Sequence, residues 1–455
     1  MENISPLYAI SPIDGRYSVQ SENLRNYFSE AALFKFRIWV EIQYLLELIS
    51  TKVLTYQLSG DEINYLEGLY KEFSLTDAFE IKNIESTTRH DIKAVEYFIK
   101  NKLQRINRED LSEFVHFALT SQDINNTAIP LSLKAATYEV ILPKLDELHQ
   151  TLFELGKNWK KIPMLARTHG QAASPSSLGK EILVFWERLG KQLSKLKQYK
   201  FSAKFGGATG NFNAHRISFE NVDWESWADQ FIFKLGLSRQ HFTTQIAHYD
   251  EIAEYFQIIV RINTIFIDLC RDIWAYISIE YFTQVSISTE VGSSAMPHKV
   301  NPIDFENAEG NCGISNAISQ HFVEKLPISR WQRDLTDSTV LRNIGLPIAH
   351  LMISVDSILR GFSKLKVNYT KIEADLGNNV LILAEAIQTV LRKEGVSQPY
   401  ELLKAFTRGK SQLSKEELIQ FINGLPVSLE TKQKLLSLSP DKYTGYACDE
   451  HFPEL

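Results

Sequence analysis

The chain has few cysteines and no paired cysteine motif. Its 455 residues include three, Cys270, Cys312 and Cys448, which are widely spaced and never form Cys-x-x-Cys. Disulfide frameworks and cysteine zinc sites need an even or closely spaced set of these residues. We therefore expect free thiols in a reducing compartment, with neither disulfides nor a zinc site.

Long apolar runs, a basic excess and a targeting segment are also missing. No stretch of 18 or more apolar residues occurs, so the sequence predicts no membrane span. Residues 1–5 lack the basic and apolar regions of a signal peptide. A net charge of -6 and a pI near 6.1 offer no basic surface to a nucleic acid. We expect a cytoplasmic protein with no membrane or nucleic-acid partner, in which local cations must bind any anionic ligand.

What the sequence does contain is enough apolar material for a large helical core. Hydrophobic residues make up 44% of the chain and charged residues 23%, as in ordinary globular proteins, and the length allows two or three domains. Apolar residues recur at helical spacing in residues 21–50 and 61–73 and after His90. Three longer stripes, at 141–159, 178–196 and 252–277, are spaced nearly as heptads.

Such long helices should pack side by side in an elongated bundle. The sequence predicts an all-α fold with three helical domains, at residues 1–112, 113–364 and 365–455. Two short strand-like segments, 242–246 and 282–287, are interpreted as loops or edge pieces. The longest helix has a second apolar face, Tyr255, Ile258, Ile262, Ile265 and Leu269. This face indicates either an oligomer or a monomeric bundle whose central helix is buried all round.

The most distinctive stretch is residues 292–307, which reads GSSAMPHKVNPIDFEN. Small residues lead to Asn301-Pro302, where Asn can cap a helix and Pro suits its first turn. Backbone amides and the helix dipole favour anions at such a terminus, and Lys299 adds a positive charge. The stretch therefore predicts a carboxylate-binding site. The plainer alternative is a Gly/Ser loop before an ordinary capped helix.

Four other polar clusters are predicted at helix ends or in loops, where functional groups are usually presented. They are TTRHD at 87–91, LTSQDINN at 119–126 preceded by His116, RTHGQ at 167–171, and RWQRDLTDS at 330–338 followed by Arg342. Each has an ordinary explanation, because Thr, Ser and Asp cap helices, a lone His is usually structural, and Arg-rich stretches are usually solvated.

Together these motifs resemble those of the fumarase/aspartase superfamily of lyases. Residues 292–302 match its signature Gly-Ser-Ser-x-Met-Pro-x-Lys-x-Asn-Pro, and 120–123, 168–171 and 207–211 resemble its other blocks. Within the superfamily, the lead SPIDGRY at 11–17 and the 89–91 and 331–338 blocks resemble the adenylosuccinate lyase family in its longer bacterial form. The resemblance extends from residue 11 to residue 410.

The resemblance implies a β-elimination that releases fumarate. The substrates would be adenylosuccinate, which gives AMP, and the succinyl-aminoimidazole-carboxamide ribotide, which gives AICAR, both in purine nucleotide biosynthesis. It implies that Ser293 is the base that removes a proton from carbon and that His169 is the acid that protonates the leaving nitrogen. Since serine alone is a weak base, the loop amides and Lys299 would have to stabilise its alkoxide. No metal or organic cofactor is implied.

The same resemblance implies substrate-binding residues for each part of the substrate. The fumaryl carboxylates would be bound by Thr120, Ser121, Lys299 and Asn301. The ribose phosphate would be bound by Arg16, Arg333, Ser338 and Arg342, since bidentate guanidinium contacts suit a phosphate. The base and the transferred group would be oriented by His90, Asp91 and Gln245. Tyr17 and Arg89, from the lead and the 89–91 block, complete the set.

The resemblance also implies a homotetramer in which three subunits build each site, and a lid at residues 286–295 that closes over substrate. A rival lyase of the superfamily, such as argininosuccinate lyase, fumarase or aspartase, would not need the phosphate-binding set. A helical scaffold or an inactive homologue would be expected to lack Ser293 or His169. The preference between the two substrates stays open, as does a share of the acid role for His90 or His116.

Overall fold

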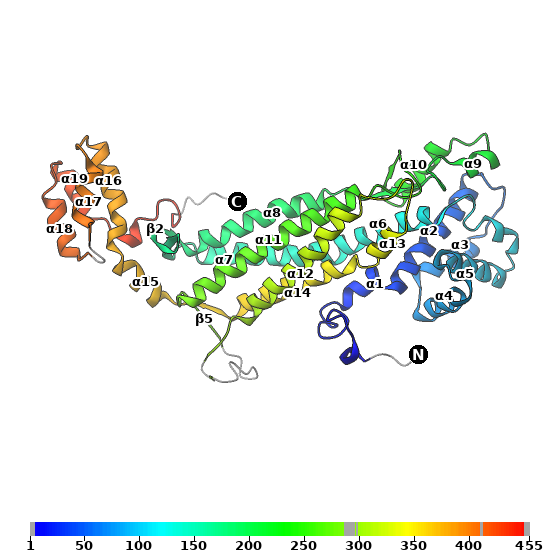
Figure 1. Ribbon diagram of the computed structural model, residues 1–455, viewed down its shortest axis with the longest axis horizontal. Coiled ribbons are helices and arrows are strands. Elements are labelled where there is room, and N and C mark those ends of the chain that lie inside the picture. The colour runs from blue at the N-terminus through cyan, green and yellow to red at the C-terminus, as the bar shows by residue number, and fades with distance from the viewer. Residues whose placement is uncertain (1–4, 286–295, 297–298, 410–412, 450–455) are drawn as a thin grey trace. The chain divides into compact units, whose positions relative to one another are not determined.

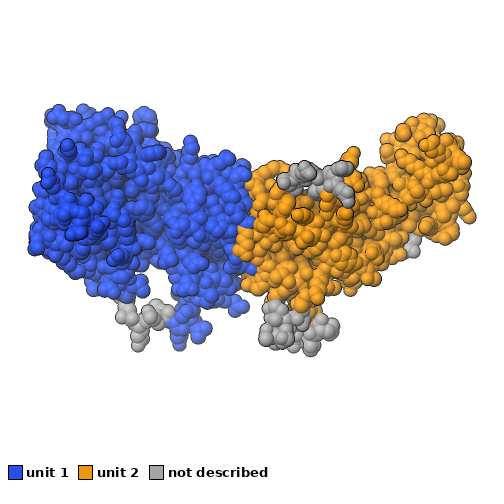
Figure 2. Space-filling view, turned by 180° about the vertical axis from the view of Figure 1, so that it is seen from behind, with its two compact units in different colours: residues 1–146, 192–266, 308–356 blue, residues 147–191, 267–307, 357–455 orange. Residues whose placement is uncertain are grey.

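The structure of the chain is a computed structural model that describes residues 5–285, 296, 299–409 and 413–449 (Figure 1). The chain forms two compact units, which are coloured separately in Figure 2. Unit 1 comprises residues 1–146, 192–266 and 308–356, and unit 2 comprises residues 147–191, 267–307 and 357–455. The division into three domains stays a prediction.

Unit 1 opens with a group of helices from the N-terminal third of the chain. They are α1 (Arg25–Phe28), α2 (Glu30–Ser50), α3 (Gly60–Lys71), α4 (Leu75–Thr88), α5 (Asp91–Arg105) and α6 (Ser121–Ala136). The helical pattern of residues 21–50 is interrupted at Ser29, which has extended backbone angles and accepts a hydrogen bond from the Ala32 amide through its hydroxyl. Ser59 and Ser74 begin α3 and α4 with capping boxes, which satisfy amides that a helix start leaves free.

Five long helices contribute residues to both units. They are α7 (Leu142–Asn158), α8 (Leu178–Lys197), α11 (Asp250–Ser278), α12 (Ile303–Lys325) and α14 (Gly345–Lys364). The three heptad-like stripes lie in α7, α8 and α11, so the prediction of these helices is confirmed. In unit 1, α11 contacts α12 through the Asn263 amide and the Ser315 hydroxyl, 2.8 Å apart, and through the rings of Phe256 and Phe322.

Both apolar faces of α11 are buried within the chain itself. Tyr255 and Ile262 of the second face are 0% exposed, and Ile265 is 2% exposed. This matches the alternative of a monomeric bundle as far as the apolar faces are concerned, although the helix is not buried all round, since Glu254, Gln257 and Arg261 are exposed. The second apolar face therefore gives no support to an oligomer.

The remaining elements of unit 1 are short. They are α9 (Asn213–Ser218), α10 (Trp224–Lys234), α13 (Thr336–Leu341) and the parallel strands β3 (Ser202–Lys204) and β4 (Ser238–Gln240). Short segments of 3-10 helix lie at Pro6–Tyr8, Glu22–Leu24 and Glu109–Phe114, and a π-helical turn at Thr137–Ile141 joins α6 to α7.

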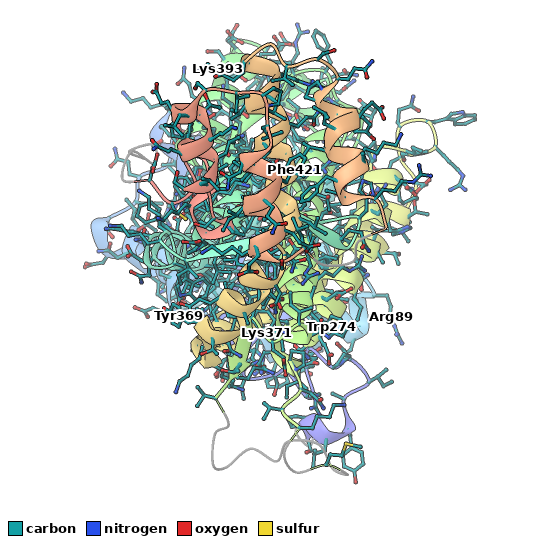
Figure 3. The ribbon with its side chains drawn as sticks, turned by 90° about the vertical axis from the view of Figure 1, so that its left-hand side faces the viewer. Arg89, Trp274, Tyr369, Lys371, Lys393 and Phe421 are labelled. Atoms are coloured by element: carbon teal, nitrogen blue, oxygen red, sulfur yellow. The ribbon has the colours of Figure 1, made fainter. Side chains whose placement is uncertain are left out.

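Unit 2 contains two antiparallel strand pairs and the C-terminal helices. The pairs are β1 (Pro163–Thr168) with β2 (Gln171–Ser177), and β5 (Phe282–Gln284) with β6 (Leu365–Val367). The helices are α15 (Tyr369–Asn378), α16 (Ala384–Lys393), α17 (Pro399–Thr407), α18 (Lys415–Asn423) and α19 (Leu429–Leu436), with 3-10 turns at Val380–Leu383 and Pro440–Lys442. They enclose a small core in which Phe421, labelled in Figure 3, stacks on Phe406 with ring centroids 4.1 Å apart.

The fold is mostly helical, as predicted, and the described residues also include three two-stranded sheets. Residues 282–284 form strand β5, whereas residues 242–246 form no strand. The segment Thr336–Lys364 is long and apolar enough, by composition, to cross a membrane. Because 72% of its most apolar part is buried within the protein, it is a core segment.

Candidate active site

A cavity of about 560 Å³ lies in unit 1, a volume that suits a small-molecule ligand. Its walls come from the α1–α2 junction, the α4–α5 junction, the first turns of α6, and α13 with its flanking loops. Phe28, Ile129 and Leu341 supply apolar surface. Seven predicted substrate-binding residues line it: Arg89, His90, Asp91, Ser121, Arg333, Ser338 and Arg342.

A sharp chain reversal between α4 and α5 presents the first three of these residues. Arg89 ends α4 in the left-handed region, with φ 55°. His90 caps α5, since its Nδ1 accepts a hydrogen bond from the Lys93 amide at 3.2 Å. His90 therefore both caps α5 and lines the cavity.

Asp91 is held between two arginines. Its Oδ2 lies 2.7 Å from Arg37 Nη2 and 3.5 Å from Arg342 Nη2. Burial raises the pKa of Asp91, but the charge and hydrogen bond of Arg37 lower it more, so the pKa lies below its ordinary value. Arg37 is 3% exposed and also donates to Asn125 Oδ1 at 2.9 Å. The sequence analysis missed Arg37, although an arginine within an apolar face of a helix was a signal.

The start of α6, at Thr120 and Ser121, is set by a buried carboxylate. Asp123 Oδ2 accepts a hydrogen bond from the Thr120 amide at 2.8 Å. Its Oδ1 accepts hydrogen bonds from Lys204 Nζ at 2.7 Å and from the Gly206 amide at 2.9 Å. The side chains of Asp123 and Lys204 are both 0% exposed. The Gly207 amide also donates to Asp123, and Gly207 has φ 80°, a conformation that favours glycine. This ion pair therefore joins the start of α6 to the Gly-rich turn.

Arg333, Ser338 and Gln245 meet beside the cavity. Arg333 donates from Nη1 to Gln245 Oε1 at 3.2 Å and from Nη2 to Ser338 Oγ at 3.3 Å. Gln122 Nε2 also donates to Ser338 Oγ, at 3.4 Å. The two partners of Arg333 in these bonds are neutral, and no carboxylate of the described residues forms an ion pair with it. Its positive charge is therefore available to an anion in the cavity.

The N-terminal lead that carries Arg16 and Tyr17 does not line this cavity. Ser21 is 3% exposed and donates to the carbonyl oxygens of Ile13, at 2.9 Å, and Tyr17, at 3.2 Å. These bonds hold the lead in consecutive turns, and the Arg16 side chain is exposed. Within a single chain, the predicted phosphate-binding set is thus only partly brought together.

His169 lies in unit 2, at the tip of the β1–β2 hairpin. Thr168 pairs with Gln171, and the two turn residues between them, His169 and Gly170, have φ values of 53° and 75°. Positive φ at both positions is the pattern of a type I′ turn, in which histidine is unusual. A strained residue of this kind is often found at a functional site. Arg167, two residues earlier, forms an ion pair with Asp375 of α15 at 3.2 Å.

Lys299 and Asn301 also lie in unit 2, just before α12. The Lys299 amide donates to the Met296 carbonyl at 2.9 Å, and Gln284 Nε2 donates to the Val300 carbonyl at 3.1 Å. The expected cap is displaced by one residue, because α12 begins at Ile303 and the Pro302 carbonyl accepts the first helical amides. The proposed base Ser293 and the predicted lid at 286–295 lie outside the described residues.

His116, which stayed a candidate for a share of the acid role, is paired with a buried carboxylate. Its Nδ1 lies 2.6 Å from Glu41 Oε1, and the Glu41 side chain is 0% exposed. Burial lowers the pKa of His116, but the charge of Glu41 raises it more, so the pKa lies above its ordinary value. His116 does not line the cavity.

Neither a metal site nor a disulfide is formed by the described part of the chain. It contains no group of three or more His, Cys, Asp or Glu side chains that could hold a metal ion. Cys270, Cys312 and Cys448 form no disulfide, and burial raises the pKa of Cys312 to about 12. A thiol in that state is a poor nucleophile.

Comparison with known proteins first identifies the class of protein. A family model described as Lyase matches residues 15–314. A solved structure of 3-carboxy-cis,cis-muconate lactonizing enzyme from Pseudomonas putida is similar, with a TM-score of 0.74 over 94% of each chain and 18% identity. A fumarate lyase structure from Mesorhizobium sp. BNC1 has a TM-score of 0.74, 16% identity and coverage of 94% of this chain and 96% of its own. The chain thus has the fold of the fumarase superfamily of lyases.

Closer relatives identify the family within that class. A model described as Adenylosuccinate lyase C-terminal matches residues 329–444. Adenylosuccinate lyase from Dictyostelium discoideum is 51% identical over a 457-residue alignment, and that from Escherichia coli K12 is 47% identical over 447 residues, each covering 98% of both chains. The chain belongs to the adenylosuccinate lyase family, whose members are fumarate-releasing carbon-nitrogen lyases.

The buried Asp123–Lys204 pair gives a testable stability prediction. Lys204→Met should lower the free energy of unfolding by about 3–5 kcal/mol, because it leaves the Asp123 carboxylate buried without its cation. Urea denaturation followed by circular dichroism measures the change. Lys191→Met is the control, since Lys191 pairs with Glu187 on an exposed face and should change stability by less than about 1 kcal/mol. Equal effects of the two substitutions would contradict the prediction.

Proposed function

We propose that the chain cleaves adenylosuccinate to AMP and fumarate, and the succinyl-aminoimidazole-carboxamide ribotide to AICAR and fumarate. The observation that carries the proposal is that seven of the predicted substrate-binding residues line one cavity. A lyase for a substrate without a phosphate would not need Arg333, Ser338 and Arg342 there. The identity of about half of the residues with adenylosuccinate lyases over the full length supports the same conclusion.

The charges in the cavity wall suit a nucleotide that carries several negative groups. The arginines Arg37, Arg89, Arg333 and Arg342 face the carboxylates Glu30, Glu85 and Asp91. Asp91 is shared by Arg37 and Arg342, whereas Arg333 is bonded to neutral groups. The phosphate is therefore assigned to Arg333 with Ser338, and Arg342 can turn to it from its longer, weaker contact with Asp91.

In the proposed reaction, Ser293 acts as an alkoxide that removes the proton from the succinyl carbon next to the one that bears nitrogen. The electron pair left on that carbon spreads into the adjoining carboxylate, where fixed donors and cations stabilise it. Lys299, Asn301, Thr120 and Ser121 are assigned to the carboxylates. The carbon-nitrogen bond then breaks, the carbon-carbon double bond of fumarate forms, and His169 gives a proton to the departing nitrogen. Arg16, Tyr17, Arg89, His90, Asp91 and Gln245 complete the proposed substrate contacts.

The hairpin geometry supports the acid role of His169. Its ring is presented at an exposed turn with strained backbone, and Arg167 ties the hairpin to α15. His116 suits the acid role less well, because its ring is engaged by Glu41. Chemistry of this kind needs no metal or organic cofactor.

We predict that Ser293→Ala abolishes turnover while AMP binding is kept, since the substitution removes the base but no phosphate contact. A loss of at least about 10²-fold in kcat is expected, in line with the typical contribution of acid-base groups. Ser294→Ala, the neighbouring substitution in the same signature stretch, is the control and should keep most of the activity. Turnover of Ser293→Ala close to that of the control would rule out Ser293 as the base.

The assembly is proposed to be a homotetramer in the cytoplasm, with each site shared by three subunits. The resemblance to the family supports this, together with the absence of Arg16, His169, Lys299 and Asn301 from the cavity wall. The partly exposed Trp274 and Ile314, 47% and 49% exposed on α11 and α12, would give apolar surface to such an assembly. Sedimentation equilibrium of the purified chain should show four copies, and a monomer that is fully active would contradict shared sites.

A further inference from the structure

Tyr249 stands at a strained position and is hydrogen-bonded to Asp337, the neighbour of Ser338 in the wall of the 560 Å³ cavity. It precedes α11, and its carbonyl accepts the Ala253 amide at 2.9 Å. Its φ of 63° lies in the left-handed region, which costs a bulky residue about 1–3 kcal/mol and persists only where the surroundings enforce it. The side chain is 2% exposed. The neighbours of Tyr249 must therefore hold it in this conformation.

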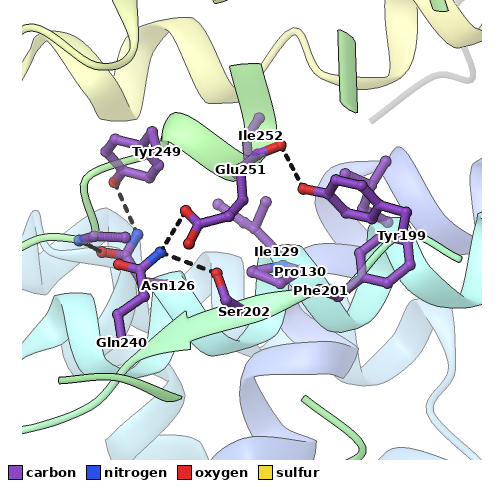
Figure 4. Close-up of a pocket in the computed structure, with 12 residues that line it drawn as sticks. Asn126, Ile129, Pro130, Tyr199, Phe201, Ser202, Gln240, Tyr249, Glu251 and Ile252 are labelled. Carbon is purple, nitrogen blue, oxygen red and sulfur yellow. Dashed lines mark hydrogen bonds between the residues drawn. The ribbon is translucent and has the colours of Figure 1, made fainter. Parts of the chain in front are cut away.

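The Tyr249 hydroxyl is the centre of a buried relay of three side chains. It donates to Asp337 Oδ2 at 2.7 Å and accepts from Asn126 Nδ2 at 2.8 Å. Figure 4 shows the bond between Tyr249 and Asn126. Asn126 and Asp337 are 1% and 4% exposed. The short distances and the burial mark a rigid arrangement.

Both ends of this relay lead back to the proposed phosphate site. At one end, Asp337 Oδ1 accepts the Ser338 hydroxyl at 3.4 Å, and Ser338 in turn contacts Arg333. At the other end, Asn126 Oδ1 accepts the Ala247 amide at 2.7 Å, two residues after Gln245. Gln245 also contacts Arg333. The relay thus fixes the two segments that present Ser338 and Gln245 to Arg333.

The bonds in this network differ in length in a way that suits ligand binding. Those around Tyr249 measure 2.7–2.8 Å, whereas those at Ser338 and Arg333 measure 3.2–3.4 Å. Long hydrogen bonds are weak. The hydrogen bonds around Tyr249 are therefore rigid. The hydroxyl of Ser338 and the guanidinium of Arg333 can exchange their partners for phosphate oxygens at little cost in free energy.

The space next to these three side chains is too small for a second ligand. The cavity beside Tyr249, lined also by Asn126 and Gln240, has a volume of about 10 Å³ and holds at most one water molecule. Burial, with the nearby Asp337 carboxylate, holds the pKa of Tyr249 well above its ordinary value, so the hydroxyl keeps its proton and remains a donor.

We propose that Tyr249 is a positioning residue: with Asn126 and Asp337 it holds Ser338, Arg333 and Gln245 in the geometry that binds the nucleotide's phosphate. It does not touch the substrate. The inference rests on the proposed function, which assigns the phosphate to Arg333 and Ser338.

The test compares Tyr249→Phe with a matched control, Tyr255→Phe, on α11, the helix that follows Tyr249. Tyr255 is 0% exposed, and its hydroxyl lies 2.9 Å from Thr137 Oγ1, so Tyr255→Phe also removes one buried hydroxyl contact. Titration calorimetry of the full-length variants with AMP and with adenosine reports affinity with and without the phosphate. Tyr249→Phe should bind AMP about tenfold more weakly and adenosine nearly unchanged, with KM raised more than kcat is lowered. Tyr255→Phe should leave both affinities unchanged.

Arg333→Leu and Asp337→Asn complete the test. Loss of AMP affinity in Arg333→Leu but not in Tyr249→Phe would keep the phosphate site and overturn the relay. Unchanged AMP affinity in Arg333→Leu would overturn the phosphate assignment itself, whatever Tyr249→Phe does. Equal losses for AMP and adenosine in Tyr249→Phe and Tyr255→Phe would make Tyr249 merely structural. Asp337→Asn weakens one end of the relay, should show the same selective loss as Tyr249→Phe, and serves in its place if that variant does not fold.

Discussion

The buried carboxylate of Asp123 is the contact on which the site in unit 1 depends. It accepts the amide at the start of α6, two amides of the Gly-rich turn and the ammonium of Lys204, all without access to solvent. A carboxylate desolvated in this way is tolerable only when hydrogen bonds and a cation surround it. Because these partners come from separate segments, the pair fixes where α6 begins and hence where Ser121 and Gln122 meet the cavity.

Electrostatics in this protein are local. The chain carries a net charge of -6, yet four arginines gather in one cavity wall. Asp91 holds two of them in place and is itself kept ionised by Arg37. Arg333 is held by an amide and a hydroxyl, so its charge is positioned without being cancelled. An acidic protein can in this way present a cationic pocket to an anionic nucleotide.

Periodicity and motifs predicted much of this organisation. The heptad-like stripes located α7, α8 and α11, because long amphipathic helices leave a strong repeating signal. Most of the short strands were missed, since strands of three residues leave little pattern and the Ser/Ala/Pro-rich β2 carries little β-propensity, whereas β5 lies in the 282–287 segment that was interpreted as a loop or edge piece. The second apolar face of α11 was ambiguous because periodicity reports burial but not the partner that buries it. In the structure its partners belong to the same chain.

The residues of the site also fall into those that the sequence predicted and those that it did not. Motif blocks located seven residues of the cavity wall, which lie at or near helix ends, whereas Arg37, inside α2, was missed. Lys204 and Tyr249 had no such signal: each is one side chain whose partner lies 81 or more residues away, and only folding brings the pair together. Ser293 lies outside the described residues, so its role rests on the resemblance of its loop to the family.

The central claim is that this site cleaves a nucleotide-bearing succinyl amine. The most direct measurement is an ultraviolet assay of the purified chain with adenylosuccinate, run beside argininosuccinate, with AMP and fumarate identified among the products. The account predicts rapid release of both products from adenylosuccinate and none from argininosuccinate. Cleavage of argininosuccinate alone would contradict the phosphate site while leaving the elimination chemistry intact, and no cleavage of either would contradict the assignment as a lyase.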